Sequence, residues 1–206
     1  MLPPTTLFLL RHGEVEERYQ HVFGGRIDMG LSPRGHEQAA ALAKYLRARN
    51  IHLVYASPMK RVQQTLVPFA SQFTNPPIVL EALQEVDFGD WTGLNGEQVR
   101  TRFNANAAAW TDQLEKAAIP NAESATRLRA RIEPCLQQMI RSHPGQNIAV
   151  VCHGGVIRMM LAILLALPFS PMGLVGIEYA SLTQVELRPH KTKLQLLNFT
   201  PWRDLP

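Results

Sequence analysis

Short apolar runs alternate with longer stretches of helical spacing through the first eighty residues. The runs at residues 7–10, 51–56 and 78–80 are short and uninterrupted, which is typical of strands buried on both faces. Apolar positions with helical spacing follow the first two runs, at about 33–50 and 58–69, and predict helices. Strands that alternate with helices favour the α/β class with a mainly parallel central sheet.

Both predicted helices follow the same pair of residues, a serine and then a proline. Ser32 is a favoured N-cap, and Pro33 suits the first helical position because an amide hydrogen there would have no partner within the helix. Ser57 and Pro58 repeat the pair, so we expect the second helix to begin there in the same way.

The alternation stops in the middle of the chain and resumes near residue 147. Residues 98–118 and 124–142 are predicted to form two helices with no strand between them. We therefore expect an insertion, at about 88–146, that folds as a helical cap over one end of the sheet. Beyond it the pattern predicts a strand, an apolar helix and two final strands, at 147–152, 156–167, 182–187 and 194–199.

Length and composition limit the class of protein. A chain of 206 residues with 46% apolar and 18% charged residues suits one soluble globular domain over residues 1–206. The net charge of +4 comes from scattered basic residues, which disfavours nucleic acid as a partner and fits a small anionic ligand. The longest apolar run, 159–167, is too short to span a membrane, and the first residues lack a secretory pattern. We expect a cytoplasmic protein with no membrane partner.

Two predicted strands are followed directly by a histidine and a glycine. Arg11 and His12 close the first strand, and His153 and Gly154 follow the strand at 147–152. A single histidine at a strand end is more often structural than catalytic. Ligands of open α/β sheets, however, bind at the carboxyl ends of the strands. Two such histidines on neighbouring strands can converge on one pocket.

Arginine residues indicate what such a pocket would bind. Arg61 lies one helical turn beyond the second serine-proline pair, so it can reach the same end of the sheet as Arg11. Guanidinium groups match phosphate oxygens in pairs, and a nearby helix N-terminus adds affinity for anions. Neither Cys135 nor Cys152 has a partner at metal-ligand spacing. These residue types together favour a phosphate-binding pocket without a metal.

Five short motifs follow one another in an informative order. They are Arg-His-Gly-Glu at 11–14, Leu-Ser-Pro-Arg-Gly at 31–35, Ser-Pro-Met-Lys-Arg at 57–61, an acidic loop at 85–91 and His-Gly-Gly-Val-Ile-Arg at 153–158. With this order and spacing the chain resembles the histidine phosphatase superfamily, in the branch of phosphoglycerate mutases and small-molecule phosphatases. It also resembles α-ribazole phosphatases and broad-specificity phosphomonoesterases. The resemblance covers most of the chain and implies a three-layer α/β/α sandwich.

The resemblance also implies a role for each of the main site residues. His12 is the nucleophile that attacks phosphorus and forms phosphohistidine, a task that suits a largely neutral imidazole. Arg11, Arg61 and His153 hold the phosphoryl oxygens. We expect His153 to be a catalytic residue for this reason. Glu85 protonates the leaving group and then takes a proton from the attacking water, which requires a partly desolvated carboxyl. No metal or cofactor is implied, because the arginines and the histidine supply positive charge.

Three further positions complete the expected substrate-binding set: Arg18, Gly25 and Gly154. Arg18 stands where the family commonly has an asparagine that helps to hold the phosphoryl group. We expect Arg18 either to replace it as an anchor or to point into solvent. At 121–124 the sequence Asn-Ala-Glu-Ser differs from the glycines that many relatives have before Glu-Ser, which leaves the detail of the cap loop open.

The expected function is hydrolysis of small phosphate esters. We class the chain as an enzyme of the histidine acid phosphatase type, a phosphoric monoester hydrolase whose partner is a small-molecule phosphate ester. The short cap and the phosphatase-like residues at 87–91 favour hydrolysis over phosphoglycerate mutase-type transfer, which is the alternative. A non-catalytic phospho-ligand binding protein is less favoured, because His12 and Glu85 are both present. The physiological substrate and the oligomeric state, including a homodimer, stay open.

Overall fold

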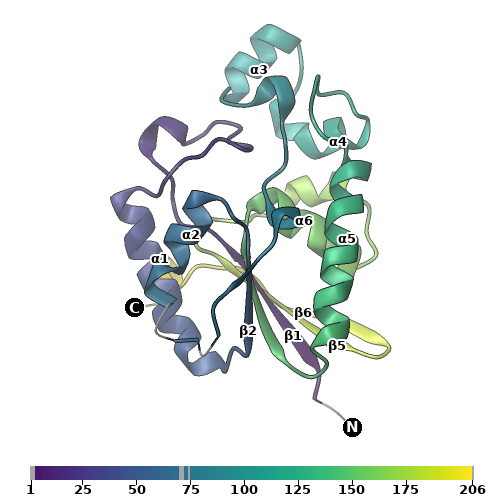
Figure 1. Cartoon of the computed structure of the whole chain (residues 1–206). Coiled ribbons are helices and arrows are strands. Elements are labelled where there is room, and N and C mark those ends of the chain that lie inside the picture. Colours follow the sequence, from purple (N-terminus) through teal and green to yellow (C-terminus); the bar gives the residue numbers. More distant parts are fainter. Residues whose placement is uncertain (1–2, 70–71, 74, 206) are drawn as a thin grey trace.

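A six-stranded sheet with helices on both faces forms the centre of the molecule (Figure 1). The computed structural model of the chain describes residues 3–69, 72–73 and 75–205, so both ends of the expected domain, residues 1–2 and 206, lie outside the described residues. The strand order across the sheet is β3-β2-β4-β1-β5-β6. The strands are β1 (Thr5–Arg11), β2 (Leu53–Ala56), β3 (Ile78–Val79), β4 (Asn147–Cys152), β5 (Leu182–Arg188) and β6 (Lys191–Phe199).

The sheet is mainly parallel, as predicted. Strands β1 to β4 run parallel to one another, whereas β5 is antiparallel to both of its neighbours, β1 and the edge strand β6. Strand β1 lies between β4 and β5, and Arg11 at its end is paired in register with Cys152 at the end of β4. The residues that follow, His12 and His153, therefore leave the sheet side by side. The expected convergence of two strand-end histidines is confirmed.

The apolar run of β1 is explained by burial on both faces, whereas the run at 78–80 was wrongly expected to be buried, because β3 is an edge strand with Ile78 40% and Val79 48% exposed. Leu7 and Leu9 of β1 belong to the core under one layer of helices, and Phe8 and Leu10 belong to the core under the other. This division follows from the strand geometry, because successive side chains point to opposite faces. All four side chains are 3% exposed or less. The apolar run is therefore a strand that helices cover from both sides.

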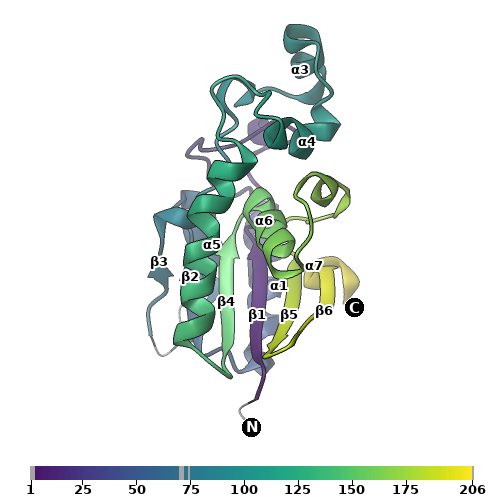
Figure 2. The same cartoon turned by 90° about the vertical axis from the view of Figure 1, so that its right-hand side faces the viewer.

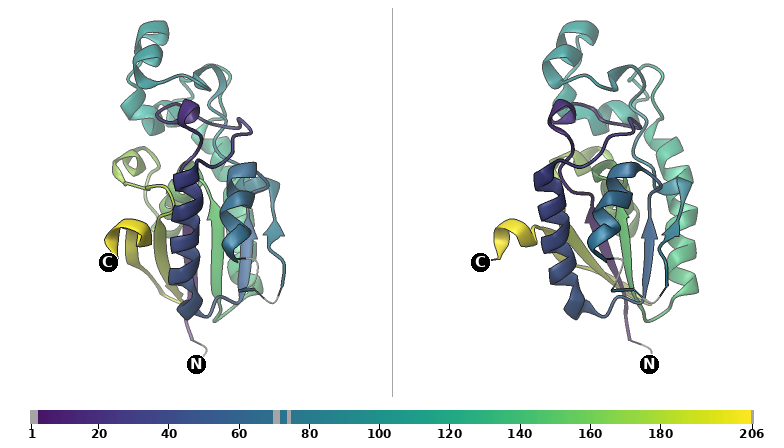
Figure 3. Two further views of the ribbon diagram at one scale, coloured as in Figure 1. Left: turned by 90° about the vertical axis from the view of Figure 1, so that its left-hand side faces the viewer. Right: turned by 60° about the vertical axis from the view of Figure 1, so that its left-hand side comes forward.

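The helices form two layers, so the molecule is the expected three-layer sandwich. Figure 2 shows α5 (Ala125–Ser142) and α6 (Gly154–Leu164) in front of the strands. The two dark blue helices in Figure 3, α1 (Pro33–Leu46) and α2 (Lys60–Leu66), cover the opposite face together with α7 (Pro201–Asp204). Within the described ranges, none of the helices combines the length and apolar character that a membrane span needs.

The cap is smaller and more broken than expected. The helix predicted at 98–118 is two helices, α3 (Gly96–Phe103) and α4 (Trp110–Glu115), because Asn104 takes a left-handed conformation with φ of 51° and ends α3. Asparagine adopts this conformation more readily than most residues. Helix α5 packs along the sheet and not over its end (Figure 2). The segment over the end of the sheet is therefore about 88–124, and the expected limit at 146 was wrong.

The two serine-proline pairs behave differently. Ser32 is the N-cap of α1, and its hydroxyl accepts a hydrogen bond of 3.0 Å from the amide of Gly35, as predicted. The second helix, α2, begins only at Lys60, and Met59 is its N-cap. The expectation that Ser57 caps this helix was wrong, because its hydroxyl lies 2.8 Å from a ring nitrogen of His153.

Candidate active site

The loop that carries His12 is fixed by close backbone packing between two of the sequence motifs. A Cβ atom on Gly13 would lie 2.5 Å from the carbonyl oxygen of Gly35, and one on Gly35 would overlap the carbonyl oxygen of Glu14. The amide of Gly13 also donates a hydrogen bond of 3.0 Å to the hydroxyl of Thr65 on α2. The glycines are required because any side chain would push the loop away from the start of α1.

His12 is buried just beyond the end of β1, and its hydrogen bonds determine its tautomer. Its Nδ1 lies 2.8 Å from the carbonyl oxygen of Gly13. A carbonyl only accepts hydrogen bonds, so Nδ1 carries a hydrogen. In the neutral ring the lone pair then lies on Nε2, where it accepts a hydrogen bond of 3.2 Å from the Nε of Arg61. His12 is thus arranged to use Nε2 as a nucleophile.

Arg61 is held in place from several sides. Its Nε lies 3.2 Å from Nε2 of His12 and also 3.2 Å from Nδ1 of His153. Its terminal nitrogens donate to the carbonyl oxygens of Gly25 (2.8 Å) and Ile27 (2.9 Å). Burial lowers the pKa of Arg61 to about 10, so the guanidinium keeps its charge at neutral pH. A fixed, desolvated cation of this kind suits an anionic group.

His153 is completely buried at the N-cap position of α6. Because its Nδ1 accepts from Arg61, its Nε2 carries the hydrogen and donates to the hydroxyl of Ser57 at 2.8 Å. The ring centroids of His12 and His153 are 5.2 Å apart. His153 is not among the residues that line the cavity described below, so in this structure it contacts the site through Arg61.

Both histidines are held in the neutral form. Burial is the largest cause of the lowered pKa of His12 and of His153, and the positive charges of Arg61 and Arg11 lower both values further. The hydrogen bond from His12 to the carbonyl of Gly13 opposes this shift in His12 only in part. Neutral imidazole is the form with a lone pair to donate.

Arg11 and Tyr179 form the next part of the wall. The guanidinium of Arg11 lies over the ring of Tyr179, 4.0 Å from its centroid, and donates to the carbonyl oxygen of Ile177 at 2.6 Å. The buried Nε of Arg11 has no hydrogen-bond partner among the described residues. This donor is therefore available to a ligand. The ring of Tyr179 also lies 5.7 Å from that of His12.

Glu85 approaches the site from the segment between two short 3-10 helices. Its carboxylate accepts hydrogen bonds from the amide of Val86 (2.9 Å) and, more weakly, from the amide of Gly155 in the first turn of α6 (3.4 Å). A Cβ atom on Gly155 would lie 2.6 Å from Oε1 of Glu85 and 2.5 Å from the buried side chain of Val86. Glycine at this position gives the carboxylate its room beside the helix.

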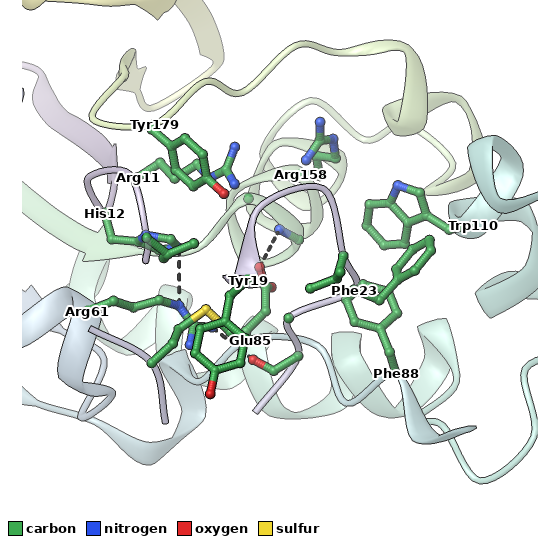
Figure 4. A pocket seen from close by; sticks show the side chains of 17 residues that line it. Arg11, His12, Tyr19, Phe23, Arg61, Glu85, Phe88, Trp110, Arg158 and Tyr179 are labelled. Atoms are coloured by element: carbon green, nitrogen blue, oxygen red, sulfur yellow. Dashed lines mark hydrogen bonds between the residues drawn. The ribbon is translucent and has the colours of Figure 1, made fainter. Parts of the chain in front are cut away.

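These side chains surround a cavity of about 170 Å³ (Figure 4). His12, Arg11 and Arg61 gather at one end, and Phe23, Phe88 and Trp110 lie at the other. The ring of Phe88 is 4.9 Å from that of Phe23 and 5.4 Å from that of Trp110, centroid to centroid. The site therefore has a charged end beside the sheet and an aromatic end beneath the cap.

The remaining expected site residues divide into two groups. Gly25 and Gly154 both line the cavity, and the carbonyl of Gly25 is one of the groups that hold Arg61. Arg18 is not brought into the cavity, so the expected phosphate anchor is a surface residue. Its side chain is 71% exposed and forms an ion pair of 2.9 Å with Glu16. A single residue separates the partners in sequence, and this local pairing directs Arg18 away from the site.

Sequence reasoning missed several residues of the site. Arg158 lines the cavity, and its Nε and one terminal nitrogen bind the carbonyl oxygens of Met172 and Val175. One helical turn separates it from Gly154, which is a signal that could have placed it on the same face of α6. Ser57 and Tyr179 had no such signal, because only the folded chain brings them to the histidines.

The comparisons with known proteins agree with this geometry. The profile of the histidine phosphatase superfamily (branch 1) matches residues 7–200. Phosphoserine phosphatase 1 of Hydrogenobacter thermophilus is 28% identical, over 94% of this chain and 92% of the relative. The 2,3-bisphosphoglycerate-dependent phosphoglycerate mutase of Bartonella quintana is 31% identical, over 76% and 79%. The α-ribazole phosphatase structure from Shigella flexneri has a TM-score of 0.81 and 26% identity, over 95% and 96% of the two chains.

The fold and the site together define a phosphoryl-transfer protein of the histidine phosphatase type. The chain belongs to the histidine phosphatase superfamily, in branch 1. The resemblance stated from the motifs is confirmed. The label of histidine acid phosphatase type was wrong, because it belongs to another branch than the one that matches. Relatives in the matching branch are phosphatases or mutases.

Proposed function

We propose that the protein is a phosphomonoesterase that hydrolyses small phosphorylated metabolites through a phosphohistidine on His12. The arrangement of His12 carries this proposal. Its Nδ1 donates to the carbonyl of Gly13, so the lone pair lies on Nε2, next to Arg61 and on the cavity that Arg11 also lines. A neutral imidazole between two guanidinium groups is suited to attack a phosphoryl group whose negative oxygens those groups neutralise.

The reaction follows in two balanced steps. Nε2 of His12 attacks phosphorus while the bond from phosphorus to the ester oxygen breaks, and the proton of Glu85 goes to that oxygen to give an alcohol. Water then attacks the phosphohistidine and gives its proton to Glu85, which regenerates His12 and releases inorganic phosphate. Glu85 lines the same cavity as His12, as both steps require.

The aromatic end of the cavity indicates the kind of leaving group. Phe23, Phe88 and Trp110 offer an apolar surface, and Arg158 adds a positive charge beside them (Figure 4). The guanidinium of Arg158 lies 5.8 Å from the centroid of the Trp110 ring. A cavity of about 170 Å³ has room for a compact ester only. We expect small leaving groups, and those with a negative charge of their own should be favoured.

Phosphoglycerate mutase-type transfer is the second candidate, because a mutase is among the relatives at 31% identity. A mutase has to retain its bound intermediate and exclude water until the phosphoryl group is returned. The small cap, about 88–124, supports hydrolysis instead. The two activities differ in product, since only hydrolysis releases inorganic phosphate.

A phosphate-release assay over a panel of small phosphomonoesters tests the proposal. The panel contains 3-phosphoglycerate, phosphoserine, sugar phosphates, nucleotides and α-ribazole phosphate, with a strong chelator present throughout. We expect release by the wild type and less than about 1% of it by His12→Ala, because the covalent intermediate forms on His12. Release by His12→Ala above a few per cent would refute the nucleophile. Bisphosphate-stimulated isomerisation of phosphoglycerate without release would favour the mutase.

A further inference from the structure

Arg131 of α5 binds the backbone of the segment that carries Glu85. One terminal nitrogen donates to the carbonyl oxygens of Ala82 (2.6 Å) and Gln84 (2.8 Å), and the other donates to that of Glu85 itself (3.1 Å). The segment at 84–88 has no regular secondary structure, so no strand or helix ladder holds it. A side chain from another element takes over that task.

Glu123 completes the arrangement from the residues just before α5. Its carboxylate accepts from the Nε of Arg131 at 3.0 Å and from a terminal nitrogen at 2.7 Å. The same carboxylate accepts the amide of Asp87 at 2.9 Å, so it holds the far side of the Glu85 segment. The pair is largely buried, with 19% of the Arg131 side chain and 7% of the Glu123 side chain exposed.

The hydrogen bonds of Arg131 exclude a direct role in substrate binding. A guanidinium has five N–H donors. The five bonds of Arg131, three to backbone carbonyls and two to Glu123, use them all. Arg131 does not line the cavity either. What it can determine is the position of the backbone from which Glu85 projects.

We infer that the pair of Arg131 and Glu123 positions Glu85 for its protonation of the leaving group. The inference rests on the proposed role of Glu85 as that acid. Helix α5 is anchored to the sheet by buried residues such as Leu128 and Ile132, so the pair ties the acid to the same core that holds His12. The forked, planar geometry of arginine suits this task, because one side chain spans three carbonyls and a carboxylate.

The effect of losing the pair should depend on the leaving group. An alkyl alcohol needs the proton of Glu85 to leave, whereas p-nitrophenolate leaves without it. Misplacing a catalytic group by about 1 Å can cost about a hundredfold in rate, and a general acid contributes about 10²–10⁴-fold. We expect Arg131→Gln to lower kcat/KM for an alkyl phosphate by about ten- to a hundredfold and kcat/KM for p-nitrophenyl phosphate by less than about threefold. The ratio kcat/KM is the measure because it ends at release of the alcohol and so excludes the hydrolysis of phosphohistidine, in which Glu85 acts for both esters. Arg131→Lys, which keeps the charge but not the fork, should fall between Arg131→Gln and the wild type.

A matched control is available on the same helix. Arg129 forms a more exposed ion pair of 3.8 Å with Glu133, in which the two side chains are 38% and 37% exposed. Arg129→Gln removes the same charge from α5 and should leave both activities unchanged. The double variant Arg131→Gln/Glu123→Gln leaves no unpaired buried charge. It should show the same difference between the alkyl and the p-nitrophenyl ester as Arg131→Gln alone. Thermal unfolding of each variant shows that folded protein is compared.

A mutant cycle with Glu85→Gln separates the inference from the proposed function. In a protein that already carries Glu85→Gln, adding Arg131→Gln should lower kcat/KM for the alkyl ester by less than about twofold, since there is no acid left to position. One pair of results would overturn the inference alone. In it, Arg131→Gln lowers kcat/KM equally for both esters, whereas Glu85→Gln lowers kcat/KM mainly for the alkyl ester. If Glu85→Gln lowers kcat/KM equally for both esters, Glu85 is not the acid that protonates the leaving group, and the inference fails with it.

Discussion

The two buried histidines should make the stability of this protein depend on pH in a defined range. Burial and the nearby arginines lower the pKa of His12 and His153 well below 6.5, so the folded state binds fewer protons than the unfolded state. The part of the free energy of unfolding that depends on neutral histidines is fully present above pH 6.5. It is lost as the pH falls from 6.5 towards the folded-state values, because protons then drive the equilibrium to the unfolded chain.

The size of the effect follows from the number of buried histidines. Each one lowers the free energy of unfolding by about 1.4 kcal/mol per pH unit below 6.5, and two lower it by about 2.7 kcal/mol. The loss continues until the pH reaches the folded-state values, and it is sizeable against the roughly 5–15 kcal/mol typical of a domain.

Urea unfolding, followed by tryptophan fluorescence in buffers without phosphate, measures this slope. His12→Asn and His153→Asn each remove one of the two groups, so each should reduce the slope by about 1.4 kcal/mol per pH unit. The matched control is His36→Asn, because His36 is exposed on α1, and it should leave the slope unchanged. If the slopes of both buried variants equal that of the wild type, the two histidines are not held neutral by the fold.

Two substitutions test the walls of the site. Gly155→Ala places a methyl group 2.5 Å from Val86 and 2.6 Å from Glu85, so we expect a loss of about 1–3 kcal/mol in stability. It should also lower turnover of alkyl esters about tenfold or more. Unchanged kinetics and unfolding temperature would contradict this packing. Arg18→Ala should change kcat and KM by less than about twofold, because the side chain is 71% exposed and paired with Glu16. A tenfold rise in KM would show that Arg18 binds the substrate.

The sequence predicted the parts of the fold and the site that depend on local pattern. The buried runs gave the strands, and the position of His12 and His153 directly after two of them was enough to predict that they meet. Arg61 does reach this end of the sheet, although from the first turn of a helix that begins at Lys60 and not at the serine-proline pair. These features follow from the geometry of strands and helices alone.

The remaining features depend on packing between distant segments. Tyr179 lies against Arg11 only because β5 pairs with β1 and brings the preceding loop to the site. Ser57 was predicted to cap a helix because nothing in the sequence shows that a buried histidine competes for its hydroxyl. The family motif left two alternatives for Arg18, an anchor or a solvent-facing residue, and its ion pair with Glu16 is consistent with the second.

The central position of β1 divides the site into parts of unequal local stability. Amide protons of β1 exchange with solvent only when the sheet itself opens, because β4 and β5 protect both edges of this strand. The segment at 84–88 has no such ladder, so its amides exchange through smaller openings that leave the sheet intact. We therefore expect the strand that precedes His12 to exchange more slowly than the segment that carries Glu85. In mild denaturant the Glu85 segment should lose its hydrogen bonds to Arg131 and Glu123 while β1 stays paired with β4 and β5.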